Sequence, residues 1–202
     1  MNGLRGAWRQ YWVALRAMIV LTIALGIAYT FVITGIGQLA LPAQSNGSII
    51  SVGGKPVGSA LLGQSFTDAH GKPLPQWFQS RPSAAGDGYD GAASSGSNLA
   101  ASNPAQQKAV EQRIATIEAS DGVPAHTIPS DAVTASASGL DPHISPAYAL
   151  LQVDRVAAAR GLPADRVRAL VESRMQGRDL GYLGDPTVNV LQLNLALSEM
   201  DK

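Results

Sequence analysis

Residues 86–103 contain the side chains with the clearest potential for nucleophilic chemistry. This run includes Ser94, Gly96, Ser97 and Asn98, and a serine hydroxyl becomes a nucleophile only when a neighbouring base takes its proton. No lysine or histidine stands near these serines in the sequence to act as that base. The run also lacks a hydrophobic period, so it is either a flexible linker or an ordered loop with a functional role.

Other chemical motifs are incomplete. Lys55 and Lys72 each follow a glycine, as in a phosphate-binding loop, but a proline follows each lysine where that loop needs a hydroxyl. The chain has no cysteine, and its three histidines have no partner at the spacing of metal ligands. The acidic and glycine-rich run at 86–91 offers too few ligands for calcium. The residues therefore indicate neither a catalytic site nor a metal site.

Residues 17–36 form an uncharged stretch of twenty residues. As a helix it would be about 30 Å long, the thickness of a bilayer core. A cleaved signal peptide would have a shorter apolar core and an Ala-x-Ala site after it, so we expect a membrane anchor. Arg5, Arg9 and Arg16 precede the stretch. The positive-inside rule then places residues 1–16 in the cytoplasm and residues 44–202 outside it.

One face of the expected membrane helix carries small residues. Thr22, Gly26, Thr30 and Thr34 recur every four residues. Such a stripe lets a second helix approach closely, and threonine hydroxyls can hydrogen-bond across the contact. We therefore interpret it as a packing face, although glycine and threonine are common in membrane helices in general.

The remainder of the chain is expected to be a mixed α/β domain with few strands. A turn at 53–56 separates two short apolar runs, 48–52 and 57–62, which indicates a β-hairpin. Asn103 and Pro104 have the residue types of a helix start, and the helix that follows has an apolar stripe formed by Val110, Ile114 and Ile117.

Three further elements are expected after this helix. A short strand is possible near Val133. Ser145 and Pro146 predict a helix that runs toward Arg160 and ends at Gly161, and Pro163 starts another. Residues 188–198 fit a strand or a helix, because their apolar residues match both periods.

Residues 134–146 form the strongest local pattern, with small residues and several turn formers. Large apolar residues are few, so we expect exposed backbone here rather than core. Two interpretations remain open. The run is a structural loop that positions the following helix through a cap at Ser145, or it is a docking loop in which Asp141, His143 and Ser145 meet a partner.

These patterns together resemble the C subunit of the bacterial Kdp potassium-transporting ATPase, a P-type pump. The thirteen residues at 134–146 carry most of the specificity, and the order of the blocks supports it. The matching segments are IGQ at 36–38, NGS at 46–48, GQSF at 63–66, WFQSRPSA at 77–84, GSNL at 96–99, SNP at 102–104, TASASGLDPHISP at 134–146, RVA at 155–157, RGL at 160–162, VNVL at 188–191 and LN at 193–194. Ser95 and the Ala100-Ala101 pair depart from the family pattern, which has glycine and Gly-Pro there.

The resemblance implies an accessory subunit in the bacterial inner membrane, needed for assembly of the pump and not itself an enzyme. Its implied partners are a potassium-translocating channel-like subunit, a P-type ATP-hydrolysing subunit, a small single-helix subunit and membrane lipid; no nucleic acid is expected. ATP and potassium are handled by the complex, and we expect no firmly bound cofactor. The family's C subunit is described as raising the ATP affinity of the pump subunit.

The implied role in ATP binding conflicts with the expected topology, because ATP is cytoplasmic and the domain is expected outside. The arginine distribution favours an outer cap near the potassium entrance, with an indirect effect on ATP. Direct contact with ATP through the loop at 94–98 would need the opposite topology. The alternative function is a membrane-tethered extracytoplasmic enzyme or binding module.

Overall fold

The structure is a computed structural model that describes the backbone of residues 2–200 and the side chains of residues 7–200. Met1, Asp201, Lys202 and the side chain of Arg5 lie outside the described residues, and so do the expectations that fall on them. The chain divides into two compact units, residues 1–49 and residues 50–202. Each unit is described by itself.

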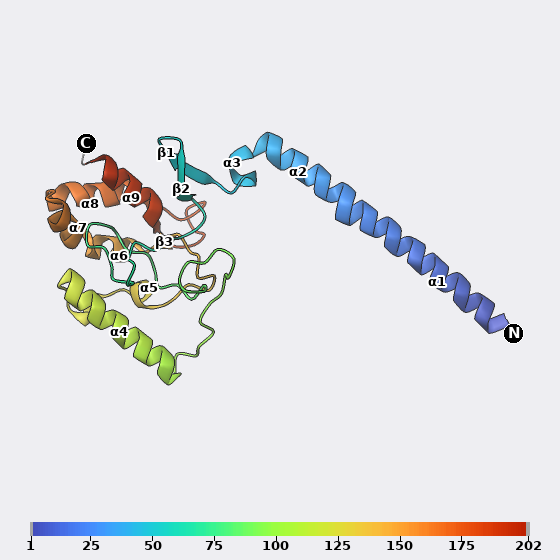
Figure 1. Cartoon of the computed structure of the whole chain (residues 1–202), viewed down its shortest axis with the longest axis horizontal. Coiled ribbons are helices and arrows are strands. Elements are labelled where there is room, and N and C mark those ends of the chain that lie inside the picture. The colour runs from blue at the N-terminus through green and yellow to red at the C-terminus, as the bar shows by residue number, and fades with distance from the viewer. Residues whose placement is uncertain (1, 201–202) are drawn as a thin grey trace. The chain divides into compact units, whose positions relative to one another are not determined.

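The first unit is dominated by one continuous helix, drawn in blue in Figure 1. It consists of α1 (Asn2–Leu21), a π-helical segment η1 (Thr22–Ala28) and α2 (Tyr29–Ala40). Among the described residues, it alone is long and apolar enough to cross a membrane, over Ala7–Ala40. At 1.5 Å per residue this stretch is about 50 Å long. The expected span at 17–36 lies inside the helix, which continues beyond it at both ends.

A short turn follows the long helix and folds back against its end. Helix α3 (Pro42–Ser45) brings Asn46 to Gln38, and the amide of Asn46 donates to the Gln38 side chain at 3.0 Å. Gly37 leaves room for this turn, since a Cβ there would lie 2.7 Å from the Ser45 hydroxyl. The IGQ and NGS segments are therefore the two halves of one local structure.

The second unit is a mixed α/β domain with few strands, as expected. Strand β5 (Thr187–Asn189) lies in the middle of an antiparallel sheet, between β3 (His143–Ile144) and β4 (Met175–Gln176). Strands β1 (Ile49–Val52) and β2 (Lys55–Ser59) form the expected hairpin. The other helices of the described chain are α4 (Pro104–Asp121), a 3-10 turn (Ala125–Thr127), α5 (Ser130–Val133), α6 (Pro146–Leu151), α7 (Val153–Arg160), α8 (Ala164–Ser173) and α9 (Val190–Glu199).

The helices enclose one hydrophobic core. Figure 1 shows α4 on one side of the domain and α7, α8 and α9 on the other. The large apolar side chains that are completely buried include Phe78, Val153, Val156, Val167, Val171, Val188, Leu193 and Leu197. The expected stripe of α4 faces this core, with Ile117 buried and Val110 and Ile114 packed against the cluster.

Most of the expected helix boundaries are confirmed. The Asn103 side chain caps α4 by accepting from the backbone N–H of Ala105, the Ser145 hydroxyl caps α6, and Gly161 ends α7 in the left-handed conformation. The helix expected from Ser145 to Arg160 is interrupted at Gln152, which separates α6 from α7.

Two expectations are settled differently. The strand proposed near Val133 is wrong, because Val133 is the last residue of the short helix α5. Residues 188–198 combine both alternatives. Val188 and Asn189 complete β5, and the Asn189 side chain then caps α9 by accepting from the N–H of Gln192. The larger part of the run is therefore helical.

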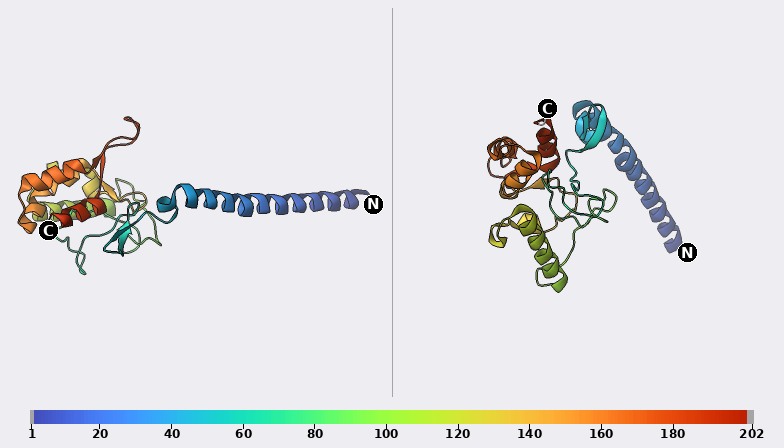
Figure 2. Two further views of the ribbon diagram at one scale, coloured as in Figure 1. Left: turned by 90° about the horizontal axis from the view of Figure 1, so that it is seen from above. Right: turned by 60° about the vertical axis from the view of Figure 1, so that its left-hand side comes forward.

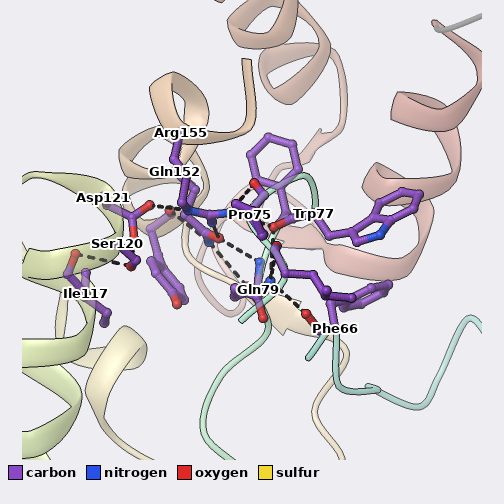
Figure 3. Close-up of polar contacts among 12 residues, drawn as sticks. Phe66, Pro75, Trp77, Gln79, Ile117, Ser120, Asp121, Gln152 and Arg155 are labelled. Carbon is purple, nitrogen blue, oxygen red and sulfur yellow. Dashed lines mark hydrogen bonds and ion pairs between the residues drawn. The ribbon is translucent and has the colours of Figure 1, made fainter. Parts of the chain in front are cut away.

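A buried polar cluster holds an irregular segment against the helices (Figure 3). The Gln152 side chain accepts from the N–H of Gln79 at 2.7 Å and from Arg155 at 2.7 Å. Arg155 also forms a buried ion pair with Asp121 at 2.8 Å and donates to the carbonyl of Trp77. Since these side chains satisfy backbone groups that no sheet pairs, residues 66–80 keep a defined path without regular structure.

Candidate functional site

The two loops singled out in the sequence, 94–98 and 134–146, lie against each other. The carbonyl of Ser138 accepts one hydrogen bond from the backbone N–H of Ser95 at 2.9 Å and a second from the Ser94 hydroxyl at 3.0 Å. Gly96 also approaches the second loop, because a Cβ on it would lie 2.9 Å from the carbonyl oxygen of Ala137. Residues 94–98 therefore form an ordered loop that packs on the strongest sequence motif.

A third segment meets the two loops at Gly139. This glycine has a φ of +67°, and a Cβ on it would lie 2.6 Å from the carbonyl oxygen of Ser95 and 2.8 Å from Ala85. Its carbonyl accepts from the Ser83 hydroxyl at 2.6 Å. Both the backbone conformation and the space require glycine here.

Asp141, one of the proposed docking residues, is engaged inside the domain. Its carboxylate accepts from the N–H of His143 at 2.9 Å and pairs with Arg81 at 3.3 Å. Burial alone would raise the pKa of Asp141, but the hydrogen bonds from His143 and the charge of Arg81 outweigh burial and lower it. The carboxylate is therefore held ionised beside Arg81.

His143 and Ser145 are also engaged within the domain. His143 belongs to β3 and pairs with Asn189 of β5. The Ser145 hydroxyl donates to Asp131 at 2.9 Å and accepts from the N–H of Tyr148 at 3.1 Å. These contacts are those of a scaffold that positions α6.

The expectation that residues 134–146 expose their backbone and stay out of the core is wrong for most of the loop. Leu140 and Ile144 are buried apolar side chains, and Gly139 and Pro142 are buried as well. Ala137 and Ser138 alone are exposed in this segment. A partner that meets this loop would contact these two residues together with the exposed side chains of Ser94, Ser97 and Asn98.

The hydroxyl groups of Ser94 and Ser97 contact backbone groups. The Ser94 hydroxyl donates to a carbonyl oxygen, which takes no proton at neutral pH, and Ser97 accepts from the N–H of Leu99. A triad needs a base that is itself oriented by a third group. Among the described residues, histidine, aspartate and glutamate side chains form no group of three that could hold a metal ion.

The small-residue stripe runs through the π-helical segment. Thr22 and Gly26 lie in η1, and Thr30 and Thr34 lie in α2. In an α-helix, four residues exceed one turn and a stripe of this spacing would drift around the axis. In the wider π turn four residues fall short of one turn, so η1 shifts the stripe the other way and offsets part of that drift. The Thr30 hydroxyl donates to the carbonyl of Gly26 at 2.9 Å, so this donor is used within the helix.

One exposed apolar feature was missed in the sequence. Between β4 and β5 the chain forms a hairpin loop, closed by a bridge from Asp179 to Leu183, which projects from the domain in Figure 2. At its tip, Leu180 is 81% exposed and Tyr182 is 69% exposed. Leu180 also has a φ of +53°, an unusual conformation for leucine. The sequence could have indicated this loop, because residues 181–184 (GYLG) place two apolar side chains between two glycines.

Comparison with known proteins identifies relatives over nearly the whole chain. The model of the family described as KdpC, the c chain of K+-transporting ATPases, matches residues 11–199. A protein of Kineococcus radiotolerans named potassium-transporting ATPase KdpC subunit is 52% identical, covering 94% of this chain and 93% of the relative. Proteins of the same name from Ralstonia nicotianae and Caldanaerobacter subterraneus are 53% and 50% identical, over 92% and 90% of this chain and 91% and 90% of theirs.

Proposed function

Because the chain belongs to the KdpC family of K+-transporting ATPase c chains, we propose that its second unit lies outside the cytoplasm and joins the potassium-translocating subunit of the pump. The chain is an accessory subunit of the Kdp pump. Its long apolar helix fits a single-pass membrane subunit. The arginines that precede its uncharged stretch at 17–36 favour a cytoplasmic N-terminus.

The exposed apolar hairpin tip is the observation that carries the assembly role. Leu180, Tyr182 and Leu183 are all exposed, although leucine side chains usually gain about 1.5–3 kcal/mol from burial. The three side chains share one projecting loop rather than being scattered. Exposed apolar clusters mark interaction surfaces, and we propose that this one meets the subunit that takes up potassium.

The role is proposed to be non-catalytic, with any effect on ATP transmitted through the assembly. Two features support it: the Ser94 hydroxyl is bonded to a carbonyl, and Asp141 is paired with Arg81. The isolated chain should accordingly hydrolyse neither ATP nor peptide. Turnover that disappears in Ser94→Ala, Ser97→Ala or His143→Ala would favour a membrane-tethered enzyme instead.

Leu180→Asn tests the assembly role. Asparagine tolerates a positive φ better than leucine does, so this change removes the apolar side chain without adding strain. We expect a normal melting temperature of the full chain and at least a fivefold loss of co-purified pump subunits. The matched control is Leu61→Ser, which alters another exposed leucine of the same domain and should leave the yield unchanged. Normal assembly of Leu180→Asn would refute the role of the hairpin tip.

A further inference from the structure

A cavity of about 320 Å³ in the second unit is lined by residues of the irregular segment and of helix α4. Its lining combines apolar and polar side chains, including Phe66, Ile117 and Tyr148 with Ser120. Three of these, Phe66, Ile117 and Ser120, border the buried polar cluster in Figure 3. This size is at the lower end of the range for small-molecule sites, which typically join an apolar lining to a few polar groups.

Two arginines from distant parts of the chain converge on this cavity. Arg81 directly follows the irregular segment, Arg113 belongs to α4, and both line the cavity. Arg113 donates to the carbonyl of Val133 at 2.8 Å, and Arg81 lies 3.5 Å from the carbonyl of Thr134. These carbonyls belong to consecutive residues, so both guanidinium groups reach the same short stretch of chain on the cavity wall.

The positive charge of this pair is only partly balanced. Arg81 shares the carboxylate of Asp141 at 3.3 Å. Arg113 forms no ion pair among residues 7–200 that the structure describes, and burial lowers its pKa without another charge to oppose the effect. Of the other charged groups on the wall, Asp121 is neutralised by Arg155, and Asp87 lies in an exposed turn.

The hydrogen-bonding capacity of the two arginines is also underused. The Nε atom of Arg81 is buried and has no partner, and its two other contacts are long. A guanidinium group has five N–H donors, and a buried donor without an acceptor costs about 1–3 kcal/mol. The contacts with the carbonyls of Val133 and Thr134 use one N–H donor of Arg113 and one of Arg81. The remaining donors favour an oxyanion, which guanidinium groups bind in pairs of parallel hydrogen bonds.

We propose that this cavity binds a small molecule with a carboxylate or phosphate group, held by Arg81 and Arg113, with its apolar part against Phe66 and Ile117. This site is separate from the hairpin tip, so it does not depend on the assembly role. The carboxylate or phosphate accepts hydrogen bonds from the unused N–H groups of both arginines, and the aromatic and aliphatic side chains contact the apolar part of the molecule.

Calorimetric titration of the full chain in detergent tests the proposal. The probes are inorganic phosphate, benzoate and benzamide; benzamide has the shape of benzoate without the charge. We expect one saturable site for phosphate or benzoate, and at least tenfold weaker binding of benzamide than of benzoate. Affinity should fall as sodium chloride is raised, as expected for a partly exposed charge pair.

Variants of α4 locate the site. Arg113→Gln should weaken binding at least tenfold, and Arg113→Lys, which keeps the charge but loses the fork of donors, should weaken it less. The control is Lys108→Gln, which removes an exposed charge from the same helix and should bind like the wild type. Absence of saturable binding by phosphate and benzoate, equal affinity for benzoate and benzamide, or undiminished binding by Arg113→Gln would each overturn the proposal. The comparison of benzoate with benzamide needs no variant, so it remains decisive if Arg113→Gln does not fold.

Discussion

The side chain of Asn194 pairs with both backbone groups of Phe78, as a neighbouring strand would. Its Oδ1 accepts from the Phe78 N–H at 2.9 Å, and its Nδ2 donates to the Phe78 carbonyl at 2.9 Å. Asn194 is 2% exposed and Phe78 is fully buried. One amide on α9 thus satisfies two buried backbone groups 116 residues away in the chain, which fixes the irregular segment on the core.

Replacing this amide should destabilise the domain strongly. Asn194→Leu keeps a similar volume but leaves two buried backbone groups without partners, at about 1–3 kcal/mol each. We expect a loss of about 3 kcal/mol and a melting temperature lower by roughly 10 °C, measured by thermal denaturation of the full chain in detergent. Gln192→Leu makes the same kind of change at a half-buried position of α9 and should shift the melting temperature far less. Equal shifts in the two variants would contradict this role of Asn194.

The sequence predicted the features that depend on neighbouring residues. The caps at Asn103 and Ser145 and the helix end at Gly161 follow from side chains within a few positions of the bonds they make. The long apolar helix followed from a simple run of composition. The short strands were less predictable, because β3 and β4 have two residues each and are defined by pairing with β5 rather than by a pattern of their own.

The irregular segment and the arginine cavity depend on contacts between distant residues, which no local period encodes. Gln79 meets Gln152 across 73 positions. One signal was nevertheless present. Arg113 lies on the same face of α4 as the apolar stripe, three residues after Val110. A charge on the core face of a helix requires a polar environment, and this one lines the cavity.

Gly26→Leu tests the small-residue stripe as a packing face. Within the chain itself the change fits, because a Cβ on Gly26 would meet only the Thr22 methyl group, at 4.0 Å. We therefore expect normal insertion into the membrane but reduced co-purification of the other pump subunits, since a bulky side chain keeps a second helix at a distance.

The control for the stripe is Gly35→Leu. Gly35 lies nine residues further along the helix, about two and a half turns, and so faces roughly the opposite side from Gly26. A Cβ at Gly35 would also meet nothing within 4 Å. If both variants assemble normally, the stripe faces lipid; if both fail, the effect is not specific to the stripe.

A single cysteine tests the topology. The natural chain has no cysteine, so Ser65→Cys creates one unique thiol at an exposed position of the second unit. In intact cells with a permeabilised outer envelope, we expect it to react with a membrane-impermeant thiol reagent. Trp8→Cys, placed in α1 before the uncharged stretch at 17–36, should react only after lysis. The reverse pattern would place the second unit in the cytoplasm and make direct contact with ATP possible.

Acid titration tests the ion pair between Asp141 and Arg81. The folded state lowers the pKa of Asp141 below its ordinary value of 3.8, so the folded state binds the proton more weakly than the unfolded state. The resulting stability is present at neutral pH and is lost as the pH falls below about 4. Asp141→Asn cannot gain or lose this proton. Because the carboxylate is partly exposed, we expect the variant to be less stable by only about 1 kcal/mol at pH 7, with a melting temperature lower by roughly 2–4 °C. The difference from the wild type should shrink toward pH 3.

The control is Asp185→Asn, which removes the carboxylate of an exposed pair with Arg178 and should show little change at either pH. A difference between Asp141→Asn and the wild type that stays constant from pH 7 to pH 3 would mean that the lost interaction is not that of the ionised carboxylate.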